Sequence, residues 1–354
     1  MPGLPNNTRW YASREAFKAA AGIGGASLDA LIDQYLEAAS EDIEQLLGLS
    51  FIPVTQTRYY PWPQRLGGSY ILRIPQGDLI AVTALQAKAL DASPTTIAAA
   101  DYFLEPVNAG PPYNRIEIDL SSSAAFESGD TSQRSILVTG RWGYREDTKA
   151  AGALAEADDG SETALDVTDA SLIGVGDTIL IGSEAMFVSA KSALTTGTTL
   201  NDTLTADLDD VTVTLANGAA VLVGEVLLLD SEKVLVEAIT GNNLTVKRAY
   251  DGSTLAAHST GITVYAYRTL TVVRAVNGTS AASHASAAAI VKYAPPANIA
   301  ELCYSKAVAH MKQGESGWTG QISGGEGAIN VRMVDLYFLE RRVIEEFSRK
   351  AVTL

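Results

Sequence analysis

Two histidines in repeated surroundings are the first side chains to consider for acid–base chemistry. His258 and His284 each stand ten residues after an arginine, Arg248 and Arg274. Imidazole changes its charge near neutral pH and is the most frequent general base in enzymes. A side chain that is duplicated together with its turn is better explained by a role in stabilising that turn. We therefore predict a structural role for both, and the third histidine, His310, stands alone in a helical pattern.

Sequence motifs of catalytic, metal and cofactor sites are missing from the chain. It has no phosphate-binding loop, no nucleophile elbow and no H-E-x-x-H zinc motif. The single cysteine, Cys303, excludes an internal disulfide and a cysteine-built zinc site. The 41 Asp and Glu residues form many pairs, and none stands out by its surroundings. We expect no catalytic, metal-binding or cofactor-binding residue, and a protein that is not an enzyme.

Length and charge narrow the class of protein further. The chain has 354 residues, enough for two or three domains, and a formal net charge of −15. Such an acidic chain repels the phosphate backbone, so a broad nucleic-acid-binding face is not expected. The sequence has neither the apolar core of a signal peptide nor a run of about 18 apolar residues. A soluble product without membrane contact is expected.

The middle of the chain differs from both ends in composition. All four tryptophans lie outside 151–295, and this window holds 17 acidic but only 7 basic residues. Gly, Thr, Ser and Asp are frequent in it, as in β-rich segments with many turns. We predict a β-rich domain of residues 148–295, inserted into a discontinuous domain made of 1–147 and 296–354.

The predicted insertion contains an internal repeat. Residues 175–190 match 223–238 at 7 of 16 positions, and residues 244–258 match 270–284 at 8 of 15. The offsets are 48 and 26, so this is no simple tandem. In one arrangement a module of about 163–190 plus 268–293 contains a nested second copy, 211–267. In the other, a degenerate first copy precedes a full copy and an orphan half. We favour nesting because it leaves no half-module with an uncovered edge.

The two ends of the chain are predicted to be mainly helical. Apolar residues recur at helical spacing over 28–47, a shorter helix covers 13–21, and further helices are expected over 298–313 and 329–349. Short strands bounded by Pro, Gly or Asp lie between them. The expected fold class is α+β: a helical bundle with short β-strands or a hairpin, interrupted by an all-β domain of two related, nested modules.

These ends resemble a known protein family. The resemblance is carried by a short helix with Tyr11, Ser13, Arg14 and Glu15 and by the six runs that follow it: IDQYLEAASEDIEQLLGLSFIP (32–53), TRYYPWP (57–63), YILRIP (70–75), YFLEP (102–106), ILVTGRWGY (136–144) and PPANIAELCYSKAVAHM (295–311). Together they are similar to the head-tail connectors, or adaptors, of bacteriophages with long non-contractile tails (siphoviruses). The inserted repeat is similar to small β-modules of phage virion proteins.

The resemblance implies a structural virion protein with a helical adaptor bundle. Such adaptors form a homo-oligomeric ring of about twelve copies under the portal protein, extend the DNA channel, and dock a neck stopper or tail protein. Genomic DNA passes through the lumen without sequence-specific binding. The expected location is the virion neck, at the head–tail interface, after assembly in the host cytoplasm. Typical members lack an insertion of this size, and we expect it on the outside of the ring.

A C-terminal arm is the candidate contact with the portal. Residues 314–328 contain six glycines, and in the helix after them Val331, Val334, Phe338, Ile344 and Phe347 lie along one side. Aromatic anchors and basic side chains are typical of protein interfaces. The predicted contact residues are Trp318, Tyr337, Phe338, Arg341, Arg342, Phe347, Arg349 and Lys350. Alternatively, this helix closes the bundle of its own chain.

Other functions stay open at this point. The chain could be another phage structural protein, such as a tail terminator, a baseplate protein or a decoration protein, using the same β-modules. It could also be a host-surface binding module, although the repeat has few of the aromatic residues that glycan sites need. A cell-wall hydrolase is the remaining alternative.

Overall fold

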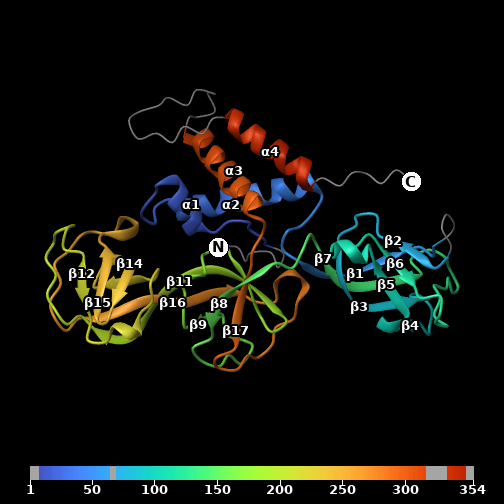
Figure 1. Ribbon diagram of the computed structural model, residues 1–354, viewed down its shortest axis with the longest axis horizontal. Coiled ribbons are helices and arrows are strands. Elements are labelled where there is room, and N and C mark those ends of the chain that lie inside the picture. Colours follow the sequence, from blue (N-terminus) through green and yellow to red (C-terminus); the bar gives the residue numbers. More distant parts are fainter. Residues whose placement is uncertain (1–7, 64–68, 316–332, 348–354) are drawn as a thin grey trace. The chain divides into compact units, whose positions relative to one another are not determined.

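The computed structural model describes residues 8–63, 69–315 and 333–347, and the protein that it shows is mostly β (Figure 1). In this described part, strand makes up 36% and helix 23%, with four helices and large antiparallel sheets. The predicted α+β class with a helical adaptor bundle is therefore wrong. The reason is that the segments expected to be short strands attached to helices pair into complete sheets with a core of their own.

The chain divides into two compact units. Unit 1 comprises Met1–Ile43, Thr148–Val276 and Ser280–Leu354, and unit 2 comprises Glu44–Asp147 with Asn277–Thr279. The helices at both ends of the chain thus belong mostly to the same unit as the β-rich middle. Residues 44–147, which were expected to belong with those helices, form most of the other unit.

Unit 2 consists of two antiparallel sheets. In spatial order, the larger sheet contains β1 (Val54–Tyr60), β7 (Ile136–Trp142), β3 (Leu79–Ala87) and β4 (Thr95–Ile97). The smaller sheet contains β2 (Ile71–Arg73), β6 (Arg115–Ile118) and β5 (Tyr102–Glu105). Their pairings join distant residues, for example Val54 with Trp142.

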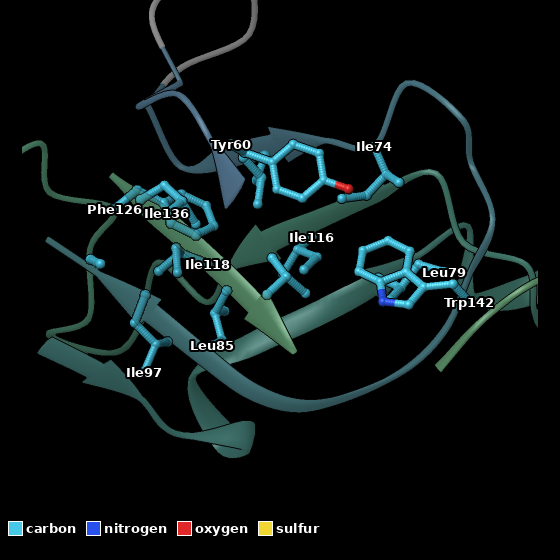
Figure 2. Close-up of a cluster of buried hydrophobic side chains, with 13 residues drawn as sticks. Tyr60, Ile74, Leu79, Leu85, Ile97, Ile116, Ile118, Phe126, Ile136 and Trp142 are labelled. Atoms are coloured by element: carbon cyan, nitrogen blue, oxygen red, sulfur yellow. The ribbon is translucent and has the colours of Figure 1, made fainter. Parts of the chain in front are cut away.

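A hydrophobic core explains why these strands form sheets (Figure 2). Residues of β7 are alternately buried and half-buried, and Ile136, Val138 and Trp142 face the core. The Trp142 indole N–H donates to the Gln56 carbonyl at 2.9 Å, and the Arg58 guanidinium carbon lies 3.9 Å from the centre of the Trp142 ring. Period-two burial is the signature of a strand with one face on a core.

The β-rich part of unit 1 consists of two modules that share two long strands, β11 (Glu184–Thr199) and β16 (Thr263–Val273). Module A adds β8 (Thr148–Ala153), β9 (Ala164–Asp166), β10 (Thr178–Ile181) and β17 (Ala289–Tyr293) to the first part of β11 and the second part of β16. Module B adds β12 (Thr212–Thr214), β13 (Val226–Leu229), β14 (Glu232–Thr240) and β15 (Asn243–Lys247) to their other halves.

Strand pairing in the two modules has the same register. Ile179 lies opposite Lys292 in module A, and Leu227 lies opposite Ala266 in module B. These pairs are related by the offsets of 48 and 26 residues that the sequence repeat shows. Module B therefore lies, in sequence, between the two segments of module A.

Each module closes into a small barrel. In module A, the Thr168 N–H donates to the Ala153 carbonyl at 2.9 Å and so joins the ends of β8 and β9. In module B, the Ala216 N–H donates to the Thr199 carbonyl at the same distance and joins β11 to β12. Each barrel has its own cluster of buried aliphatic residues. Closure removes the free sheet edges that would otherwise pair with other chains.

Four helices complete unit 1: α1 (Arg14–Ala21), α2 (Asp29–Leu47, whose last turn is counted with unit 2), α3 (Ala297–Glu315) and α4 (Met333–Phe347). The Ser13 hydroxyl accepts from the Ala16 N–H at the start of α1, and Gly22 ends the helix with φ 64°. A side-chain acceptor at the start and a left-handed glycine at the end are the usual helix limits. The helices predicted over 13–21 and 28–47 are confirmed.

Candidate functional site

The outer face of α4 carries two adjacent exposed aromatic side chains. Tyr337 is 58% exposed and Phe338 is 59% exposed, and their ring centres lie 5.9 Å apart in an edge-to-face arrangement. Aromatic rings that lie together on the surface are candidates for contact with another molecule. In Figure 1, α4 is the red helix that lies beside α3.

The inner face of α4 closes the helical part of unit 1. Leu339, Val343 and Phe347 are buried at four-residue intervals. The sequence predicted that Phe338 lies on the apolar side of this helix. In the structure Leu339 is buried instead, and Phe338 is exposed to solvent. Phe347, predicted as a partner contact, lies inside the protein and is not available on this surface.

Two arginines extend the aromatic face. Arg341 follows Tyr337 by one helical turn and forms an ion pair with Glu345 at 3.0 Å. Arg342 follows Phe338 by one turn and lies 3.9 Å from Glu301 of α3. The side chains of both arginines are more than half exposed to solvent. Exposed pairs of this kind contribute little stability, so both guanidinium groups can exchange to a partner's carboxylates at little cost.

The structure thus brings together four of the eight predicted contact residues: Tyr337, Phe338, Arg341 and Arg342. We call these four residues the α4 face. The other predicted residues besides Phe347, namely Trp318, Arg349 and Lys350, lie outside the described residues.

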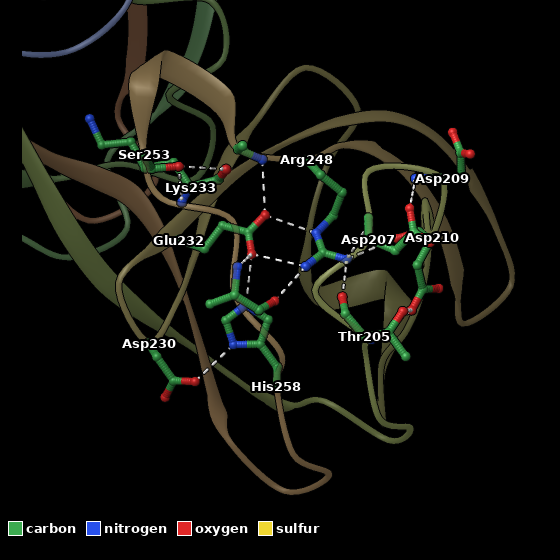
Figure 3. A network of polar contacts seen from close by, with 12 residues as sticks. Thr205, Asp207, Asp209, Asp210, Asp230, Glu232, Lys233, Arg248, Ser253 and His258 are labelled. Carbon is green, nitrogen blue, oxygen red and sulfur yellow. Dashed lines mark hydrogen bonds and ion pairs between the residues drawn. The ribbon is translucent and has the colours of Figure 1, made fainter.

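A buried ion network lies at one end of the barrel of module B (Figure 3). The Arg248 guanidinium donates to both carboxylate oxygens of Glu232, at 2.8 and 2.9 Å, and both side chains are fully buried. His258 Nε2 lies 2.9 Å from Glu232, and its Nδ1 lies 2.8 Å from Asp230. The backbone N–H groups of Ala249 and Ala256 also donate to Glu232. Every oxygen of this buried carboxylate therefore has partners.

Module A repeats this network with one exchange. Arg274 donates to Glu184 at 3.1 and 2.7 Å, and His284 Nε2 lies 3.0 Å from the same carboxylate. The second carboxylate is Asp158, which accepts from Arg274. Gly182 occupies the place that Asp230 has in module B, so among the described residues no second carboxylate pairs with His284 as Asp230 does with His258.

Sequence reasoning noticed the histidines and arginines of these networks but missed their centre. Glu184 and Glu232 are the residues that hold each network together. Both belong to the aligned Ser-Glu pair of the 48-residue repeat, so the signal was present in the sequence. The link between the glutamate and the other two residues was not recognised, because the arginine and the histidine repeat at an offset of 26 residues and the glutamate at an offset of 48.

The network makes the stability of module B sensitive to acid. Burial alone would raise the pKa of Glu232, but hydrogen bonds from Arg248, the Ala249 and Ala256 N–H groups and His258 outweigh it and lower the pKa to about 2. A carboxylate whose pKa is lower in the folded state stabilises that state above its unfolded pKa, here 4.5.

We therefore expect protection of the amides of module B against hydrogen exchange to fall as the pH decreases from about 4.5 towards 2. Glu232→Gln should flatten this dependence, whereas Glu237→Gln, an exposed change on the same strand, should leave it unchanged. If amide protection in Glu232→Gln fell as steeply with decreasing pH as in the unchanged chain, Glu232 would not be the source of the acid sensitivity.

Neither a metal site nor a membrane span is found within residues 8–63, 69–315 and 333–347. Among these residues there is no group of three or more His, Cys, Asp or Glu side chains that could hold a metal ion. No helix within the same ranges is long and apolar enough to cross a membrane.

Comparison with known proteins gives no relative. The chain matches no protein-family model, no curated protein and no solved structure. The similarity of its ends to phage adaptors therefore stays a prediction from the sequence.

Proposed function

We propose that this protein is a structural component of a bacteriophage virion that joins head to tail. It forms a ring beneath the portal, extends the DNA channel, and offers a docking surface to the stopper or tail protein. The proposal concerns this role and not the helical bundle that was first expected, since the architecture is mostly β. The runs of residues that resemble adaptors support it at the level of sequence.

The observation that carries the proposal is the α4 face. α4 buries one side against the rest of unit 1 and presents two aromatic rings and two arginines on the other. Aromatic and arginine side chains are enriched at the centres of protein interfaces. We assign this face to the portal contact.

The charge of the chain suits a DNA channel. A ring of about twelve copies, each with a net charge of −15, would carry on the order of 180 negative charges. Like charges weaken the contact with phosphates, so DNA would slide through such a ring without being held.

The proposal is tested by mixing the chain with the portal protein of the same phage and separating the products by size. We expect a stable complex that survives dilution. Separate elution of the two proteins under conditions in which the portal ring is intact would contradict the proposed function.

A further inference from the structure

The turn between β13 and β14 carries an aspartate in a backbone conformation that favours glycine. Asp230 and Ser231 join these two antiparallel strands, and the φ of Asp230 is 52°. A left-handed conformation costs energy for a residue with a Cβ, although aspartate tolerates it better than most. Module A has Gly182 at this place, with φ 59°. The backbone alone favours glycine here, so the reason for the aspartate lies in its side chain.

The Asp230 carboxylate contacts a buried histidine (Figure 3). It lies 2.8 Å from His258 Nδ1, and the Glu232 carboxylate lies 2.9 Å from Nε2 of the same ring, which is 1% exposed. The third charged group around the ring is Arg248, whose guanidinium donates to the same oxygen of Glu232 as His258 Nε2. Loop 205–210 contacts Arg248 through its backbone carbonyls. The ring of His258 therefore lies between two carboxylates.

These contacts determine the charge of the histidine. The hydrogen bonds that lower the pKa of Glu232 to about 2 keep its carboxylate ionised. The Asp230 side chain is 57% exposed, and a carboxyl group in water is ionised at neutral pH. Ionised carboxylates only accept hydrogen bonds, so both ring nitrogens of His258 must donate. An imidazole that donates from both nitrogens is the doubly protonated form, so His258 is positively charged in the folded module.

His284 of module A has no such requirement. Its Nε2 lies 3.0 Å from Glu184, and within the described ranges no carboxylate pairs with its Nδ1. The second carboxylate of this network, Asp158, pairs with Arg274 instead, at 2.6 Å. A neutral imidazole with its proton on Nε2 satisfies this arrangement, and the guanidinium group stays charged at all pH values near neutral.

We propose that Asp230 and His258 form a proton-binding site that makes module B, but not module A, lose stability as the pH rises above neutral. An imidazole in an unfolded chain releases its proton near about pH 6.5. Above that pH the folded module binds more protons than the unfolded one, and linkage then lowers its stability as the pH increases. The limit for one proton is about a tenfold change in the opening equilibrium per pH unit. The inference does not depend on the role proposed in the neck.

Backbone pairs beside the two histidines give matched probes of the two sites. The His258 N–H donates to the Leu204 carbonyl at 2.9 Å, and the Leu204 N–H donates to the His258 carbonyl at 3.0 Å. His284 and Asp158 form the equivalent pair in module A, at 2.9 and 2.8 Å. The amides of module A therefore serve as the reference for those of module B in the same chain.

The first test measures the protonation of the rings directly. In nitrogen-15 NMR spectra of the full chain at pH 8, we expect His258 to carry a proton on both ring nitrogens and His284 on one. Asp230→Gly introduces the residue of module A, which has no backbone cost at this turn, and should leave His258 with one ring proton. A single ring proton on His258 at pH 8 in the unchanged chain would overturn the inference.

The second test measures stability by hydrogen exchange of the full chain between pH 7 and pH 9. Protection is taken relative to an unstructured chain at the same pH. For the amides of Leu204 and His258 we expect it to fall by up to about tenfold per pH unit. For those of Asp158 and His284 it should stay constant. Equal decreases in both modules would overturn the inference.

Exchanging the turn residues tests whether this one position makes the difference. Asp230→Gly should remove the decrease from module B. Gly182→Asp should confer it on module A, because a Cβ at this glycine would have only His284 Cε1 within 4 Å, at 4.0 Å. Asp209→Asn, which changes an exposed carboxylate of module B, should have no effect.

Two results with these variants would overturn the inference. The first is an unchanged decrease in Asp230→Gly, and the second is constant protection of module A in Gly182→Asp. Circular dichroism checks that both variants fold, which is expected because each introduces the residue that the other module carries at the same turn.

Discussion

Replacing Glu232 by alanine is expected to lower the free energy of unfolding of module B by about 3–5 kcal/mol. The change removes the buried carboxylate that accepts from Arg248, from His258 and from two backbone N–H groups. Arg248 then stays buried as an uncompensated charge, which costs more than the loss of the hydrogen bonds alone. Native-state hydrogen exchange of β13 to β15 is the appropriate measurement, because a chain with two compact units need not unfold in one step.

A matched control tests whether any loss of a glutamate from β14 destabilises the module. Glu237→Ala changes an exposed glutamate on the same strand and should alter the free energy by less than about 0.5 kcal/mol. Glu184→Ala is the equivalent change in module A and should destabilise that module by a similar amount as Glu232→Ala does module B. A loss below about 1 kcal/mol for Glu232→Ala would show that the network does not hold the barrel together.

Placing charges on the α4 face is expected to abolish most of the affinity for the portal. The double variant Tyr337→Asp with Phe338→Asp removes both exposed rings and adds two negative charges beside Arg341 and Arg342. Central aromatic residues typically contribute about 2–4 kcal/mol to an interface, which corresponds to a loss of about 30- to 1,000-fold in affinity. Titration of the labelled chain with purified portal rings measures the change.

The fold of this variant should be intact, because α4 is held by the other face, through Leu339, Val343 and Phe347. Circular dichroism and the melting temperature check this point. Leu208→Asp, in module B, is the control for an exposed apolar residue away from α4 and should bind the portal normally. Portal affinity that is unchanged in the double variant would assign the contact to another surface.

The helices of the fold could be predicted from the sequence, because their signals are local. The Ser13 cap, the glycine after α1 and the three- and four-residue apolar spacing of α2 are all visible in short windows. The sheets of unit 2 could not be assembled in this way, since Val54 pairs with Trp142 across the whole segment. Short strands were predicted in this segment. Which of them pair into one sheet over a common core depends on contacts between residues that are far apart in the sequence.

The candidate site was also predicted only in part. The composition of α4 indicated aromatic and basic contacts, and four of the eight residues share one exposed face. Phe347 was assigned to the wrong side because a helix with apolar residues at several spacings permits more than one buried stripe.

The central claim, that this chain is a ring-forming adaptor on the portal, is tested most directly by the mass of the assembly. Native mass spectrometry would be applied to the chain alone and to its mixture with the portal ring of the same phage. The proposed function predicts a complex in which about twelve copies of the 354-residue chain are bound to one portal ring. A mixture that yields only the separate masses of the chain and of the portal ring would contradict it.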